Sequence, residues 1–173
     1  MRTYSPTDSL KVFCLTSIPF MFSLFWIIFG IVPINTTFFS SFHFSYIYIC
    51  LFCWLLITPH IMTPFWVFLL GVLTDFLYGN PLGVSTVCFL LIAIITSSQH
   101  RFLNHRPESF LWLVFSLLIL PILFIQWALA SLLNFHLMPI LPVFAETFVL
   151  IGFFPFIFYL CNFLYERYLE DLE

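Results

Sequence analysis

Charged residues are scarce in this chain, and their scarcity decides its class. Only 8% of its 173 residues are charged and 62% are hydrophobic, whereas a soluble domain carries about 25% charged residues. A chain this apolar cannot cover its surface with polar groups, which excludes a soluble globular protein. No basic stretch is long enough to bind nucleic acid, so that class of partner is excluded as well.

The chain also lacks the residue patterns of catalytic and metal sites. Its five cysteines are odd in number and lie inside apolar runs, which is not a disulfide framework. Cys50 and Cys53 form a C-x-x-C pair, but thiols within an apolar run behave mostly as small hydrophobes. His100 and His105 have no cysteine or carboxylate pair at ligand spacing. Without a nucleophile elbow or a phosphate-binding glycine loop, we expect no enzyme, no cofactor and no metal.

What is present is a series of six apolar runs, each near the length that a membrane span requires. They cover residues 12–32, 38–57, 62–78, 82–97, 109–133 and 140–165. The sequence therefore predicts an all-α integral membrane protein, a six-transmembrane-helix bundle formed by one domain over residues 1–173. Residues 1–11 form a leader, residues 12–165 hold the six spanning helices, residues 98–108 form a polar loop and residues 166–173 form a tail. We expect kinks at the prolines within the runs, namely Pro19, Pro64, Pro121 and Pro155.

The positions of the basic residues predict the orientation. All five lie in three places: Arg2 and Lys11 in the leader, Arg101 and Arg106 in the central loop, and Arg167 in the tail. An even number of runs separates these places, so all three fall on one side of the membrane. Because positive loops stay in the cytoplasm, we expect both termini to be cytoplasmic.

The third run carries an acid and ends in a turn. Asp75 lies in the stretch FWVFLLGVLTDFLYGNPLG, from Phe65 to Gly83. An ionised carboxylate in hydrocarbon is costly, so we favour a position facing other helices over one that reaches to the interface. Gly71 shares the helix face of Asp75 and would let another backbone come close. An inward hydrogen-bonding role predicts that Asp75→Asn largely keeps function and that Asp75→Leu loses it.

Glu146 is a second acid, about six residues into the last run. It belongs to the same outer half of the membrane as Asp75. Other polar residues are expected near this level: Asn35, Asn80, Gln126, Asn134 and His136. Glu146 either joins them in a polar cluster inside the bundle or reaches to the interface, and the sequence does not decide between the two.

The chain resembles the MreD family of bacterial rod shape-determining membrane proteins. The resemblance rests on Pro59-His60, on GVLTDFLYGNPLG from Gly71 to Gly83, and on the late acid Glu146. Individual positions carry over only within the most specific piece, at Gly71, Asp75, Pro81, Leu82 and Gly83. With Glu146, these are the candidate structural or partner-docking residues.

The resemblance implies a non-enzymatic scaffold or regulator of the cell-elongation machinery in the bacterial inner membrane. Its partner would be MreC, and through MreC it would be linked to MreB, RodA and the elongation transpeptidase in lateral peptidoglycan synthesis. The family also looks similar in fold to the substrate-binding subunits of energy-coupling-factor vitamin transporters. The alternative function is therefore that of a vitamin-type transporter subunit, which would need a cavity with convergent polar groups.

Overall fold

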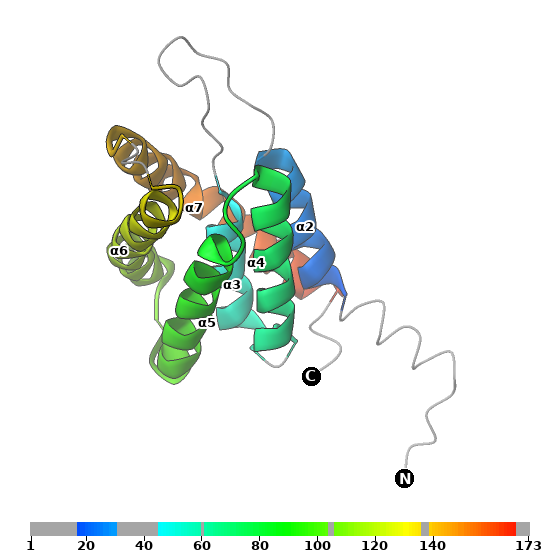
Figure 1. Cartoon of the computed structure of the whole chain (residues 1–173). Helices are drawn as coiled ribbons and strands as arrows, with labels where there is room; N and C mark the ends of the chain where they lie inside the picture. The colour runs from blue at the N-terminus through cyan, green and yellow to red at the C-terminus, as the bar shows by residue number, and fades with distance from the viewer. Residues whose placement is uncertain (1–16, 31–44, 60, 104–105, 136–138, 169–173) are drawn as a thin grey trace, which may run out of the picture.

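The computed structural model is all-helical over the residues it describes, which are 17–30, 45–59, 61–103, 106–135 and 139–168. In this part of the chain it has six α-helices and no strands (Figure 1). They are α2 (Ile18–Gly30), α3 (Ile47–Ile57), α4 (Pro64–Tyr78), α5 (Val84–Leu103), α6 (Glu108–Leu133) and α7 (Leu141–Tyr168). Each helix falls within or overlaps one of the six apolar runs, so the prediction of an all-α chain is confirmed.

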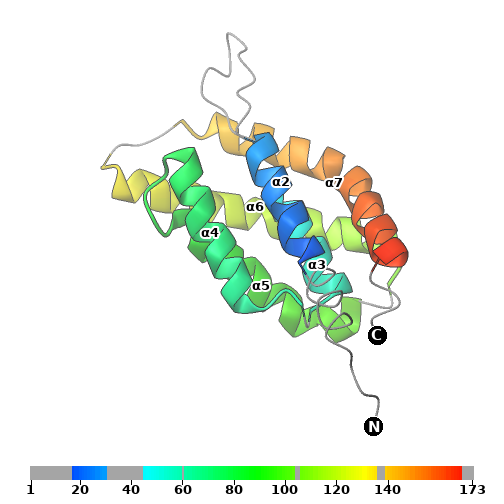
Figure 2. The same cartoon turned by 90° about the vertical axis from the view of Figure 1, so that its right-hand side faces the viewer.

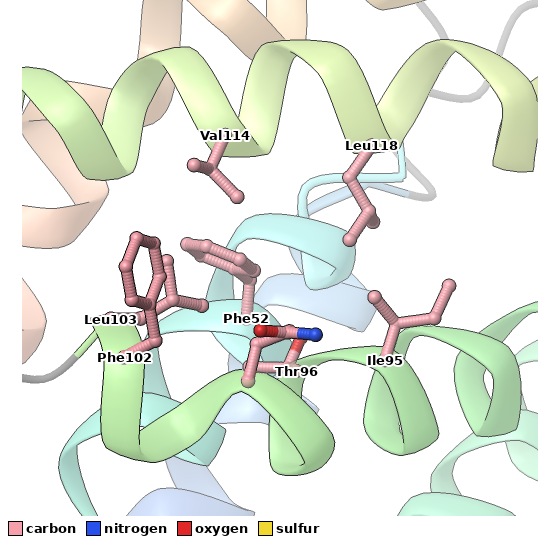
Figure 3. Close-up of a pocket in the computed structure, with 8 residues that line it drawn as sticks. Phe52, Ile95, Thr96, Phe102, Leu103, Val114 and Leu118 are labelled. Carbon is pink, nitrogen blue, oxygen red and sulfur yellow. The ribbon is translucent and has the colours of Figure 1, made fainter.

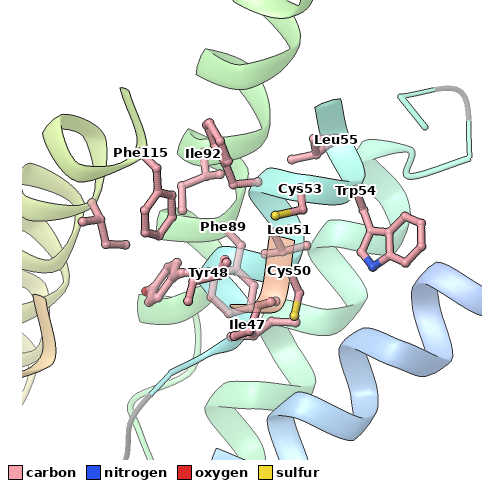
Figure 4. Packing of buried hydrophobic residues seen from close by; sticks show 14 of the residues in the cluster. Ile47, Tyr48, Cys50, Leu51, Cys53, Trp54, Leu55, Phe89, Ile92 and Phe115 are labelled. Carbon is pink, nitrogen blue, oxygen red and sulfur yellow. The ribbon is translucent and has the colours of Figure 1, made fainter. Parts of the chain in front are cut away.

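The helix α3 lies at the centre of the bundle. Its residues from Ile47 to Leu56 are all buried, and it packs against α2, α5 and α7. Figure 4 shows side chains from several elements around it, among them Phe89 and Phe115. The ring of Phe52 lies 5.3 Å from that of Phe115, centroid to centroid. A helix that is apolar on every face belongs in an interior, and this one carries the C-x-x-C pair as buried free thiols.

The helix α5 is longer than predicted, and the polar loop is correspondingly shorter. Residues 98–103 were expected in the loop, but the helix continues to Leu103. Polar side chains in this extension find partners without leaving the helix. The Ser98 hydroxyl donates to the Ile94 carbonyl at 2.7 Å, and His100 Nε2 lies 3.0 Å from the Leu56 carbonyl oxygen. The prediction failed because polarity alone does not end a helix, and residues 98–103 contain no glycine or proline that would end it.

The expectation of four proline kinks was wrong for two of them. Pro64 is the first residue of α4 and Pro19 the second of α2, where the missing N–H would have no partner in any case. Pro121 and Pro155 do lie inside helices. Pro155 frees the carbonyl four residues earlier, that of Ile151. Trp112 Nε1 of α6 donates to this oxygen at 2.9 Å, so a neighbouring helix replaces the lost bond.

The outside of the bundle is apolar. Large hydrophobic side chains are exposed on every helix but α3, for example Phe76, Leu117 and Phe148, each more than three-quarters exposed. Two helices, α6 and α7, are long and apolar enough to cross a membrane; the other four apolar stretches are 10–17 residues long within the described part. Exposed apolar surface on this scale is typical of a membrane-facing protein.

The helices are arranged as hairpins around α3. Figure 2 shows α4 beside α5, and α6 running along α7, with α2 in front of α3. The first residues of α2 and the last of α7 lie at the same end of the bundle. The opposite end holds the turn between α4 and α5 and the start of α7, and both predicted acids lie toward it.

Candidate functional site

The turn between α4 and α5 is built by two glycines. Gly79 ends α4 in the left-handed conformation at φ 67°, and Gly83 has φ 104° just before α5. Side chains disfavour such angles, so glycine is needed at both positions. The chain thus reverses between them as predicted. Pro81 is half-buried and Leu82 is 72% exposed, so the Leu82 side chain points away from the bundle interior.

Asp75 lies one turn before this reversal and is fully buried. Its Oδ1 accepts a hydrogen bond from the Ser85 N–H at 2.8 Å. Its Oδ2 accepts from the N–H of Gly83 at 2.8 Å and from the N–H of Thr86 at 3.4 Å. The Thr86 hydroxyl is also 3.2 Å from Oδ2. All of these groups can donate, which suits a carboxylate that only accepts.

These donors are the free N–H groups at the start of α5. The first N–H groups of a helix have no partner within it, and a side chain just before the helix usually accepts from them. Gly83 occupies that position here and has no side chain. Asp75 supplies the missing acceptor from the preceding helix, and its negative charge lies at the positive end of the α5 dipole.

Gly71 sets the distance between α4 and α5. A Cβ atom at Gly71 would lie 2.5 Å from Cα of Thr86, far closer than two carbon atoms approach without bonding. The backbones therefore touch at this point, one turn from Asp75 on the same face of α4. This close approach brings the first turn of α5 within hydrogen-bonding reach of the carboxylate.

Glu146 of α7 accepts in a comparable way from the backbone just before a different helix, α3. Its Oε1 accepts from the backbone N–H of Ser45 at 3.0 Å, two residues before α3. Next to it, the Tyr48 hydroxyl donates to Oε1 of Gln126 at 2.5 Å, joining α3 to α6. We call Ser45, Tyr48, Asp75, Gln126 and Glu146 the polar layer. Each member is buried or half-buried, and together they join α3 to α6 and α7 and α4 to α5.

The polar layer differs in part from the expected cluster. Gln126 belongs to it, but the Asn134 side chain is exposed and donates to the Ala130 carbonyl of its own helix. Asn80 is half-buried, and its backbone N–H donates to the Asp75 carbonyl. Asn35 and His136 lie outside the described residues. The sequence analysis missed Ser45 and Tyr48 because neither lies near an acid along the chain.

The geometry of the polar layer suits joining helices. Both oxygens of Asp75 accept from the start of α5, and Oε1 of Glu146 accepts from the backbone before α3. Over the described residues, no three His, Cys, Asp or Glu side chains come together in a way that could hold a metal ion.

The fold and the polar layer define an all-α protein of membrane type, whose two inward acids, one buried and one half-buried, accept hydrogen bonds at or just before the starts of other helices. A family model described as rod shape-determining protein MreD matches residues 11–168. The chain therefore belongs to the MreD family, and membership implies involvement in rod-shape determination. Comparisons with curated proteins and with solved structures gave no match.

Proposed function

We propose that this protein is a non-enzymatic scaffold of the cell-elongation machinery, which maintains rod shape by organising lateral peptidoglycan synthesis with MreC. The observation that supports a scaffold most directly is the polar layer. Its two acids hold the starts of α5 and α3 in place. Groups that are engaged in this way fix the shape of a docking surface, and the family match supplies the process in which that surface acts.

The proposed setting is the bacterial inner membrane, with all six helices spanning it and both termini in the cytoplasm. The apolar exterior and the six helices among the described residues support this arrangement. In a variant without native cysteines, single cysteines at positions 80 and 136 should react with an impermeant reagent added outside. A cysteine at position 104 should react only after the membrane is permeabilised. Labelling of position 104 from outside would overturn the proposed orientation.

The scaffold role is tested by shape and by association together. Cells that depend on this protein should be rod-shaped, and the tagged protein should retain MreC and the elongation transpeptidase on purification. The matched variants are Asp75→Leu, which removes the acceptor at α5, and Glu166→Gln, which changes an exposed carboxylate. At equal protein levels, we expect Asp75→Leu to lose rod shape and MreC, and Glu166→Gln to keep both. If the Asp75→Leu protein still retained MreC on purification from cells that had lost rod shape, a role through MreC would be contradicted.

The alternative, a vitamin-type transporter subunit, gains no support from the family match, which describes a shape-determining protein. The transporter alternative is tested by a different experiment from the scaffold role, because a transporter subunit should retain a vitamin after purification. Specific retention of a vitamin without MreC would replace the scaffold proposal.

A further inference from the structure

A cavity of about 200 Å³ lies between α5 and α6, away from the polar layer. Figure 3 shows it between the last turns of α5, which contribute Thr96 and Phe102, and the facing side of α6, which contributes Val114 and Leu118. We call this cavity the α5–α6 slot. An apolar cavity of about 150 Å³ in another protein is large enough to bind benzene. The slot can therefore hold part of a hydrocarbon chain.

One polar group in the slot has no partner. Thr96 is 1% exposed, and its Oγ1 makes no hydrogen bond within the described part of the protein. Ser85 Oγ of α5 is, like Thr96 Oγ1, without a partner among the described residues. Six other Ser and Thr side chains donate to the carbonyl four residues earlier: Ser23, Thr58, Thr74, Ser98, Ser116 and Thr147. A buried hydroxyl without a partner is destabilising. An acceptor placed in the slot would remove that cost.

A cation lies at the end of the slot. The guanidinium carbon of Arg106 is 4.4 Å from the ring centroid of Phe102 and 5.6 Å from that of Phe110. Phe102 itself lines the slot. Stacking on two rings holds the guanidinium in place, and its planar fork matches phosphate oxygens. No acid in the described part of the chain forms an ion pair with it.

The order of these groups along α5 matches the order of groups in a phospholipid. Arg106 lies beyond the helix, Gln99 is exposed in its last turns, and Thr96 is about 10 Å inside its end, at about 1.5 Å per residue. A headgroup phosphate would meet the cation first. Ester carbonyls would then reach the amide and the hydroxyl, and an acyl chain would fill the apolar remainder.

We propose that the α5–α6 slot is a binding site for one anionic glycerophospholipid of the leaflet at this end of the bundle. Its phosphate pairs with Arg106, an ester carbonyl accepts from the Thr96 hydroxyl, and one acyl chain lies between α5 and α6. The charge of Arg106 selects an anionic headgroup over a zwitterionic one. The bound lipid fills the slot and packs α5 against α6.

The test uses the purified full-length protein in detergent, with dioleoyl phosphatidylglycerol and dioleoyl phosphatidylcholine as probes that share their acyl chains. Native mass spectrometry measures the bound lipid. Wild-type protein should prefer phosphatidylglycerol. Arg106→Gln should lower that affinity about fivefold, the factor for about 1 kcal/mol per surface cation, and lower the affinity for phosphatidylcholine by less, because the choline already offsets the charge of that phosphate. Arg167→Gln removes the same charge from α7 at the same end and should have no effect.

Two further variants test the slot itself. Val114→Phe should fill it and lose both lipids. Thr96→Val keeps the shape but removes the unpaired hydroxyl, so it should raise the melting temperature without lipid and reduce the increase that added lipid produces. Equal binding of the two lipids by wild-type protein, equal effects of the two arginine variants, or normal binding by a folded Val114→Phe protein would each overturn the proposal.

Discussion

Replacing Asp75 by asparagine should destabilise the protein, contrary to the expectation from sequence alone. That expectation treated asparagine as keeping the shape and the hydrogen bonding of Asp75 and losing only its charge. The structure shows both oxygens in use, Oδ1 with the Ser85 N–H and Oδ2 with the N–H groups of Gly83 and Thr86. Asparagine has one oxygen, and its NH₂ group would face a backbone donor.

The magnitude follows from the number of donors left without an acceptor. In its better orientation, asparagine keeps Gly83 and Thr86 but loses the buried Ser85 N–H. One buried unsatisfied group costs about 1–3 kcal/mol. Leucine leaves all three N–H groups without an acceptor, so Asp75→Leu should lower the free energy of unfolding by about twice that amount or more.

The assay is reversible unfolding of the purified protein in mixed micelles, driven by increasing SDS. The control is Glu166→Gln, the same chemical change at an exposed carboxylate that accepts from Asn162. It should change the free energy of unfolding by less than about 0.5 kcal/mol. If Asp75→Asn unfolded like the wild type, the carboxylate would not be needed to cap α5, and the argument from its two oxygens would be refuted.

Three other changes test the packing and the remaining helix contacts. Gly71→Ala should separate α4 from α5 and destabilise the protein by about 1–3 kcal/mol, because the new methyl would overlap Cα of Thr86. The control is Gly152→Ala, whose new methyl has open space around it. In the same unfolding assay this control should be neutral or slightly stabilising. Trp112→Phe should cost about 1 kcal/mol, since it removes the donor to the carbonyl freed by the proline of α7; an unchanged unfolding midpoint would show that this bond is not needed. Glu146→Gln should cost less than Asp75→Asn, because the amide oxygen can still accept from the backbone before α3; an equal loss in both would mean that charge decides.

Much of the fold could be predicted from the sequence because apolar runs and turn residues are local features. The helices α6 and α7 begin and end within about three residues of the predicted runs. Glycine at two positions and proline between them predict the reversal after α4. The inward position of Asp75 followed from one physical argument, the cost of a charge in hydrocarbon.

The rest depends on contacts between segments that lie far apart in the sequence. The helix α3 is apolar on every face, but which helices cover it, namely α2, α5 and α7, depends on packing between distant segments. In the extension of α5, His100 contacts the Leu56 carbonyl, which lies 44 residues earlier in the sequence. Ser45 and Glu146 are 101 residues apart. Ser85 and Thr86, directly after Gly83, are typical residues of a helix start and could have suggested that Asp75 accepts from them.

Each of the two acids accepts a hydrogen bond from the backbone at or just before the start of another helix. This role explains why they lie where charge is most costly. A helix that starts inside an apolar bundle has N–H groups that water cannot reach, and an uncapped start is therefore costly. A local side chain would satisfy those groups within one segment. Here the acceptor for α5 comes from α4, and the acceptor before α3 comes from α7. Neither acid can lose its partner without loosening the contact between two segments. Their burial is thus accounted for by bundle shape, as a scaffold requires, without assigning them a reaction.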